Sequence, residues 1–191
     1  MTSLIYTNGN GHTHAASPLE RFVQPLRRTP IQRVLLVTDG TVTEILEAYT
    51  GESMRLIKLY EDIVTLDADL PGLDFVAGQQ ALRRKILLQG KMSLTNFLFA
   101  DSYVALDRLD DWMRHGLLES HKPIGFLMQE RRLETFREIV GCGRELADGL
   151  APYFGVSDGD GMIWRTYRVL SGGQPIMFIT EKFPEAHFPA G

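Results

Sequence analysis

The sequence contains almost no cysteine, no long apolar run and no excess of positive charge. Its 191 residues include one cysteine, Cys142, so no disulfide can form within the chain. A chain without internal disulfides is typical of a reducing compartment. No segment reaches the roughly 18 apolar residues of a membrane helix, and the N-terminus lacks the basic-then-apolar run of a signal peptide. We therefore expect a soluble, cytoplasmic protein without a membrane partner.

The charge balance and the missing motifs exclude several classes of function. The net charge is −4, whereas a nucleic-acid-binding domain usually carries a basic face, so we expect no nucleic-acid partner. The chain has no glycine-rich dinucleotide fingerprint, zinc-ligand spacing or nucleophile elbow. His12 and His14 have no nearby cysteine or acidic residue to complete a metal site. The sequence therefore predicts no metal and no cofactor.

What is present is the composition of one globular domain. Hydrophobic residues make up 44% of the chain and charged residues 23%, as in ordinary soluble domains, and the length suits a single core. Residues 1–17 are rich in threonine, asparagine, glycine, serine and histidine and lack hydrophobic periodicity. We interpret this segment as a flexible tail. Residues 18–191 are predicted to form the single domain.

Hydrophobic periodicity and turn residues predict an α+β domain built on an antiparallel sheet. Two segments are ambiguous, because 32–38 fits a buried strand or a helix edge and 133–141 fits a helix or a strand. The remaining expected elements are helices at 41–50, at 106–118 and from Pro123, a broken helix at 145–155, strands at 53–64, 81–89 and 94–104, a loop at 70–74, and a hairpin of 162–170 with 175–183.

Local sequence signals support two of these predictions. Thr41 and Glu44 have the spacing of a capping box, and Gly51 is suited to end the helix that follows. The segment 171–173 (Ser-Gly-Gly) lies between two predicted strands. It therefore indicates a hairpin turn rather than a phosphate-binding loop, which would precede a helix.

Strand alternation directs two charged side chains toward the core. Successive residues of a strand face opposite sides of the sheet, so Arg84 shares a face with the aliphatic residues of 82–88, and Glu181 shares the more apolar face of 175–183. A buried charge must be paired or hydrogen-bonded. Either the two residues pair with each other, or Arg84 reaches the rim through its long stem. The functional alternative is a closed pocket where Arg84 binds a carboxylate and Glu181 contacts a proton or hydroxyl.

Weaker candidates lie elsewhere. Arg165, Tyr167 and Arg168 are able to contribute to an anion site, although such residues more often lie on a solvated strand face. Cys142 is interpreted as a small buried side chain rather than a catalytic thiol.

Five segments carry a more specific signal: LLVTDGTVTEILEAYTGE, RRKILL, KPIG, FREIVG and RTYRVLSGGQPIMFITEKFP. Through them, roughly residues 18–184 resemble the chorismate lyase (chorismate pyruvate-lyase) family, in particular the branch typical of mycobacteria, cyanobacteria and archaea. The resemblance implies a single antiparallel sheet with helices and a site buried beneath helical flaps. It also implies a strand for 133–141.

The resemblance implies a role for four residues of this chain. Arg84, just before an Ile-Leu-Leu strand, matches the family's catalytic arginine, and Glu181 matches its essential glutamate. Backbone amides near Val42 and Ile124 would complete the substrate site. The implied reaction converts chorismate to 4-hydroxybenzoate and pyruvate without a cofactor, for quinone or phenolic-lipid synthesis.

The sequence also departs from the family and leaves alternatives open. The segment 145–155 looks like an insertion, and Asp101 stands where the shorter proteobacterial enzymes carry a basic residue. One alternative is a lyase that makes a different hydroxybenzoate. Another is a non-catalytic module that binds a small acid, as in the UTRA effector domains of transcription regulators. A monomer or weak dimer is expected.

Overall fold

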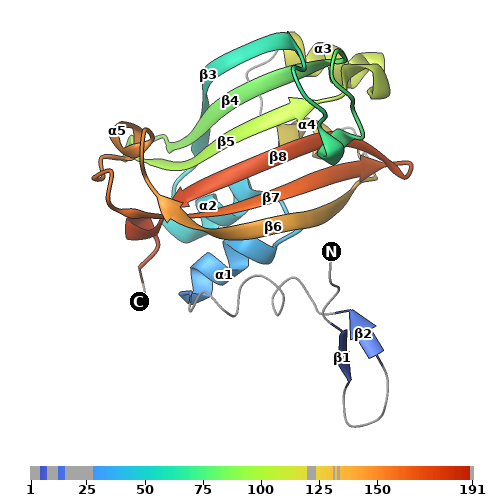
Figure 1. The fold of residues 1–191 in the computed structure, drawn as a ribbon. Coiled ribbons are helices and arrows are strands. Elements are labelled where there is room, and N and C mark those ends of the chain that lie inside the picture. Colours follow the sequence, from blue (N-terminus) through green and yellow to red (C-terminus); the bar gives the residue numbers. More distant parts are fainter. Residues whose placement is uncertain are drawn as a thin grey trace.

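One antiparallel sheet of six strands forms the body of the computed structural model, which describes residues 5–7, 13–15, 28–119, 124–130, 132 and 134–189. The strand order is β3-β4-β5-β8-β7-β6 (Figure 1). Each neighbouring pair is antiparallel, which confirms the predicted α+β class. The strands are β3 (Met54–Thr65), β4 (Gln80–Gly90), β5 (Asn96–Val104), β6 (Phe136–Leu146), β7 (Gly161–Ser171) and β8 (Gln174–Pro184).

Four helices cover one face of this sheet, and α2 and α4 lie behind it in the view of Figure 1. Their buried side chains share the main hydrophobic cluster with one face of the strands. Hydrophobic burial of this kind is the dominant favourable term in folding. The helices are α1 (Pro30–Val37), α2 (Val42–Thr50), α3 (Asp111–Glu119) and α4 (Ile124–Glu130).

In the described part of the chain, two short segments cover the opposite face, each over its own small cluster. A 3₁₀ turn, η3 (Pro71–Leu73), packs near one end of the sheet, where Leu73 and Phe178 contribute to one cluster. The short helix α5 (Ala151–Phe154) packs near the other end with Leu87. Because neither segment spans the sheet, the deep core lies on the face that α1 to α4 cover.

Several predicted elements are confirmed. The helix predicted at 41–50 is α2, and Gly51 ends it with a positive φ of 73°. The terminal hairpin is present, with Gly172 at φ 55° and Gly173 at φ 80°. The ambiguous segment 133–141 contributes to the strand β6, as the family resemblance implied. The other ambiguous segment, 32–38, belongs to the helix α1, whose capping box joins Thr29 and Gln32.

Three details were predicted wrongly. The helix expected at 106–118 is interrupted, because a 3₁₀ turn, η4 (Leu106–Arg108), ends before α3 begins. The carboxylate of Asp110 accepts a hydrogen bond from the Met113 amide at 2.8 Å and so starts a new helix there. The helix expected at 145–155 reduces to α5, since β6 continues to Leu146 by pairing with β7. Thr41 precedes α2 but makes no side-chain capping bond.

The remaining predictions have less support from the structure. Within residues 1–17, β1 (Ile5–Thr7) pairs with β2 (Thr13–Ala15), and the flexible tail stays a prediction. Pro123 lies outside the described residues. No described helix has the length and apolar character needed to cross a membrane, and in the described part of the chain no three metal-binding side chains gather at one point. The 3₁₀ turn η5 (Glu185–His187) follows the last strand.

Candidate active site

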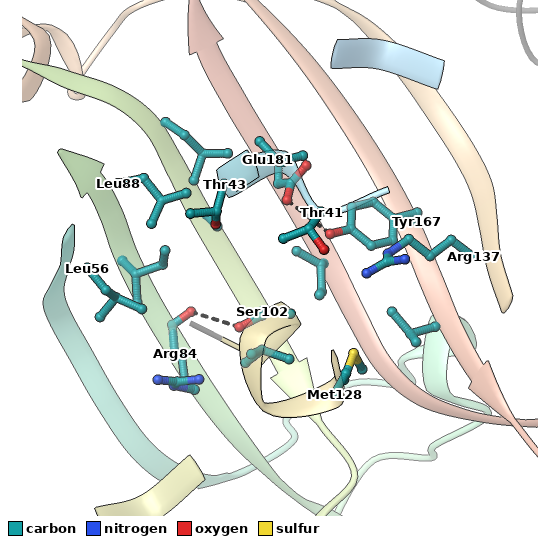
Figure 2. A pocket seen from close by; sticks show the side chains of 18 of the residues that line it. Thr41, Thr43, Leu56, Arg84, Leu88, Ser102, Met128, Arg137, Tyr167 and Glu181 are labelled. Atoms are coloured by element: carbon teal, nitrogen blue, oxygen red, sulfur yellow. Dashed lines mark hydrogen bonds between the residues drawn. The ribbon is translucent and has the colours of Figure 1, made fainter. Parts of the chain in front are cut away.

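A pocket lies between the helical face of the sheet and the first turns of α2 and α4 (Figure 2). It encloses about 710 Å³ of empty space, part of which is open to solvent. Strands β4, β5, β7 and β8 supply most of its walls, and aliphatic side chains alternate there with a few polar ones. This combination of size and lining is typical of a site for one small molecule.

Arg84 enters the pocket from the middle of β4 and is only 1% exposed. Its Nε donates a hydrogen bond to Oε2 of Glu61 at 2.6 Å. Its Nη2 is buried without a hydrogen-bond partner among the described residues. Burial lowers the pKa of Arg84, against the opposing effect of the Glu61 carboxylate, but a guanidinium remains charged at neutral pH. Nε is therefore held in place by Glu61, and Nη2 can donate to an anion.

A β-bulge in β3 determines which residue stands beside Arg84. The register between β3 and β4 shifts between Lys58 and Tyr60, so Glu61 is the residue paired with Arg84. Without the extra residue, regular alternation would place Tyr60 there. The bulge is thus what supplies a carboxylate to the buried guanidinium, in keeping with the occurrence of bulges next to functional sites.

Glu181 lines the pocket from β8, and both of its carboxylate oxygens are engaged. Oε2 accepts from Nε of Arg165 at 2.7 Å, and Oε1 accepts from the Tyr167 hydroxyl at 3.0 Å. Burial lowers the pKa of Arg165, but the Glu181 carboxylate and Tyr167 outweigh it, so the net shift is upward. Burial raises the pKa of Tyr167. The phenol therefore stays protonated and continues to donate to Glu181.

Two helix starts bring backbone amides to the pocket. Val42 is the first residue of α2 and Ile124 the first of α4, and both line the pocket. Amide N–H groups in the first turn of a helix have no acceptor within that helix, so they are available to a ligand. Gly125 allows the two starts to approach each other, because a Cβ at this position would lie 3.3 Å from Cγ2 of Thr41.

The structure brings Arg84, Glu181, Val42 and Ile124 together around one pocket, although they come from four separate segments. Strand alternation correctly predicted that both charges point inward. The two simpler interpretations of these charges were wrong, since Arg84 pairs with Glu61 rather than with Glu181 and does not reach the surface. The roles of the four residues in catalysis and binding remain predictions.

The sequence did not predict that several further residues belong to the site. Ser102 lies on the pocket face of β5 and could have been found by alternation from the predicted strand. Arg137 also lines the pocket, but its strand was ambiguous and a bulge lies between Ile139 and Gly141. Tyr167 was assigned more readily to a solvated face, and it is buried instead.

Three other residues do not belong to the pocket. Asp101 forms an ion pair with Arg83 at 2.7 Å on the opposite face of the sheet, so its departure from the family pattern does not alter the pocket lining. Arg168 pairs with Glu138 at 2.6 Å, again on that face. Burial raises the pKa of the half-buried Cys142 to about 11, so this thiol is protonated at neutral pH and unsuited to act as a nucleophile.

Comparison with solved structures identifies the fold. The effector domain of PhnF from Mycobacterium smegmatis matches with a TM-score of 0.63 and 16% identity, over 82% of this chain and 95% of that one. The C-terminal domain of a histidine utilization repressor from Pseudomonas syringae matches with a TM-score of 0.54 and 16% identity, over 72% of this chain and 96% of that one. Similarity at this level of identity establishes the fold alone.

Comparison of sequences identifies the family. The family model described as chorismate pyruvate-lyase Rv2949c-like matches residues 36–188. The chorismate pyruvate-lyase of Mycobacterium leprae is 31% identical over 158 residues, which cover 82% of this chain and 75% of that protein. The chorismate pyruvate-lyase of Mycobacterium tuberculosis is 32% identical over 161 residues, which cover 82% and 80%. Because the family model and both relatives match most of the chain, this protein belongs to the chorismate pyruvate-lyase Rv2949c-like family and is an enzyme of that kind.

Proposed function

We propose that this protein converts chorismate to 4-hydroxybenzoate and pyruvate in the pocket around Arg84 and Glu181, with no metal or redox cofactor. The observation that carries the proposal is the buried Arg84 guanidinium, whose Nη2 has no partner among the described residues and which lines a pocket shared with Glu181. Such a pocket suits a small acid that also bears a hydroxyl group. Membership of the lyase family supports the reaction type.

The chemistry makes limited demands on the protein. Chorismate carries two carboxylates, a ring hydroxyl and an enolpyruvyl ether. The bond between the ring and the ether oxygen breaks, and a proton leaves the ring carbon that bears the hydroxyl. The enolpyruvyl methylene gains a proton, which yields pyruvate. Because the ring becomes aromatic, the driving force is large, and the protein has only to orient the substrate, exclude water and assist one proton transfer.

The proposed roles combine the family resemblance with the place of each residue in the pocket. Arg84 binds the ring carboxylate through Nη2, which has no hydrogen-bond partner among the described residues. The amides of Val42 and Ile124 add hydrogen-bond donors without adding a charge. Glu181 receives the hydroxyl-bearing end of the ring, where it accepts a hydrogen bond and assists proton transfer.

A carboxylate in a pocket for a dianion needs compensation, and Arg165 supplies it. The Arg165 guanidinium is 1% exposed and donates to Glu181 at 2.7 Å and to the Thr38 carbonyl at 2.8 Å. The resulting pair is neutral as a whole, so Glu181 repels the substrate less than an isolated carboxylate would. Its oxygens also stay oriented, because Tyr167 holds the second one.

Direct measurement of turnover tests the proposal. The purified chain is incubated with chorismate in the presence of a chelator, and pyruvate and aromatic products are separated by chromatography. We expect equal amounts of pyruvate and 4-hydroxybenzoate. Another hydroxybenzoate would change the product but retain the lyase. Absence of pyruvate above the uncatalysed rate, in a folded sample, would overturn the proposal in favour of a module that only binds small acids.

Replacement of Arg84 tests the site. We expect Arg84→Ala to lower kcat/KM for chorismate by about 100-fold or more, because it removes a charged, buried hydrogen-bond donor. Arg83→Ala is the matched control, since Arg83 is the adjacent arginine on β4 but pairs with Asp101 on the opposite face. Circular dichroism checks that both variants are folded. Unchanged turnover by Arg84→Ala would exclude Arg84 from the site.

A further inference from the structure

The pocket contains a second guanidinium that the roles above leave unused. Arg137 lies on the edge strand β6 and lines the pocket opposite Arg84 (Figure 2). Three strands separate β4 from β6 in the sheet, so about 19 Å separates the two backbones at the usual strand spacing. The two guanidinium groups lie on different sides of the pocket: Arg137 reaches inward from the β6 side, whereas Arg84 stays on the β4 side, where its Nε donates to Glu61 of β3. They therefore create two anion-binding positions at opposite ends of one pocket.

Among the described residues, the contacts of Arg137 leave most of its donors unused. One nitrogen donates to the backbone carbonyl of Asp39, which directly precedes the pocket-lining segment 40–43. No acidic side chain in the described part of the chain forms an ion pair with Arg137, whereas the other guanidinium groups at the site have one, Glu61 for Arg84 and Glu181 for Arg165. A guanidinium has five N–H donors, so within the described residues the charge of this pocket-lining arginine has no carboxylate partner and several of its donors are left for a ligand.

The surroundings of Arg137 place it near the end of the pocket where Glu181 lies. Burial raises the pKa of Tyr167, and the positive charge of Arg137 acts against that rise, as expected for groups that lie close together. Tyr167 in turn donates to Glu181 at 3.0 Å. A ligand group beside Tyr167 would therefore meet Arg137 on one side and the hydroxyl-binding carboxylate on the other.

The shape of chorismate matches this arrangement, and the inference rests on the proposed function. With the ring carboxylate at Arg84 and the ring hydroxyl at Glu181, the ether lies on the carbon next to the hydroxyl. Its carboxylate then extends to the side of Glu181. We infer that Arg137 binds the enolpyruvyl carboxylate and thereby selects a dianion. The product 4-hydroxybenzoate has lost this group, so Arg137 favours the substrate over the product.

Binding and turnover of a charge-removing variant test this inference. The variants are Arg137→Met and Arg137→Lys, and Arg168→Met is the matched control, because Arg168 lies on the neighbouring strand and faces away from the pocket. Steady-state kinetics give kcat and KM for chorismate. Calorimetry gives Kd for two unreactive probes, 4-hydroxybenzoate with one carboxylate and 3-(carboxymethoxy)-4-hydroxybenzoate with two.

The inference predicts a selective loss. In Arg137→Met the KM for chorismate and the Kd of the dicarboxylate should rise about 10- to 100-fold, as for a lost charged hydrogen bond, while the Kd of 4-hydroxybenzoate changes less than about threefold. Arg137→Lys should retain part of the affinity, since it keeps the charge but loses the fork. The control should behave like the wild type.

Two further outcomes separate this inference from the proposed function. If the wild type turns over chorismate but Arg137→Met weakens both probes equally, the lyase stands and the role of Arg137 is overturned. If the wild type produces no pyruvate but Arg137→Met still loses only the dicarboxylate, the lyase proposal fails and the selection of dianions by Arg137 is supported.

Discussion

At the scale of single residues, the pocket depends on charges that the sheet buries. Arg84, Arg165 and Glu181 are each less than one-tenth exposed, although an unpaired buried charge is strongly unfavourable. Each arginine is compensated by a carboxylate, Glu61 in one case and Glu181 in the other. Since apolar residues of similar volume are often at least as stable as a buried ion pair, the network is better explained by ligand binding than by stability.

The pair of Arg165 and Glu181 yields a stability prediction. Glu181→Gln removes the negative partner and leaves Arg165 buried with its charge uncompensated. We expect the free energy of unfolding to fall by about 3 kcal/mol, the lower end of the range for a broken buried ion pair, since the amide oxygen still accepts one hydrogen bond. Urea denaturation followed by circular dichroism measures this change.

A double variant provides the control for this prediction. Arg165→Met with Glu181→Met removes both charges, so no uncompensated charge remains, and its stability should lie within about 1 to 2 kcal/mol of the wild type. Activity should be lost in both variants. Equal stability of Glu181→Gln and the wild type would show that solvent reaches Arg165 and that the charge is not effectively buried.

The sequence correctly predicted which way the side chains of Arg84 and Glu181 point, but it did not predict which residues pair with them. The period of two along a strand indicated that Arg84 and Glu181 face the core, and no tertiary information was needed. The partners were not predictable, because Glu61 reaches Arg84 only through an irregular register. Similarly, Arg165 and Glu181 are separated by 16 positions in the chain and meet only when β7 and β8 pair.

At the scale of elements, the two faces of the sheet differ, because one holds the pocket and the other does not. The helices α1 to α4 cover the face with the pocket, and η3 and α5 cover the two ends of the other face. Changes in η3 should therefore alter stability without altering the site.

The elements whose boundaries were predicted wrongly lie at 106–118 and 145–155. In the first, capping by Asp110 overrides a continuous helical pattern. In the second, pairing of β6 with β7 does so.

Gly72 provides the test of this separation. A Cβ at this position of η3 would overlap the ring of Phe178, so Gly72→Ala should force η3 away from the sheet. We expect the free energy of unfolding to fall by about 1 to 3 kcal/mol, as for overpacking elsewhere, with KM for chorismate unchanged. Gly159→Ala is the control, because a Cβ there would meet no atom within 4 Å.

Urea denaturation and steady-state kinetics distinguish the outcomes for Gly72→Ala. Lower stability with normal KM supports the independence of the two faces. A raised KM at unchanged stability would mean instead that η3 is coupled to the pocket through the sheet.

At the scale of the whole molecule, the pocket draws on segments from most of the domain. Its lining includes Val42, Arg84, Ile124, Arg137 and Glu181, which belong to two helices and three strands. A ligand that contacts several of these segments at once can bind only the folded state. Binding should therefore raise the free energy of unfolding of the whole domain, and not only the stability of one local element.

Thermal denaturation with product tests this linkage. At 4-hydroxybenzoate concentrations about 100 times Kd, the free energy of unfolding should rise by about 2.7 kcal/mol. For a domain of this size that corresponds to an increase in Tm of roughly 5 to 10 °C. Arg84→Ala should abolish the increase. No change in Tm for the wild type at millimolar product would contradict a product site in this pocket.

The sequence by itself determined the fold class, the terminal hairpin, the inward direction of Arg84 and Glu181, and the family resemblance. These depend on local periodicity, turn residues and short motifs, all of which are properties of neighbouring residues. Only the tertiary structure decided that Glu61 and Arg165 hold the two charges and that Arg137 joins the site. Those contacts depend on strand order and on bulges, which arise from pairing between distant segments and leave no local pattern.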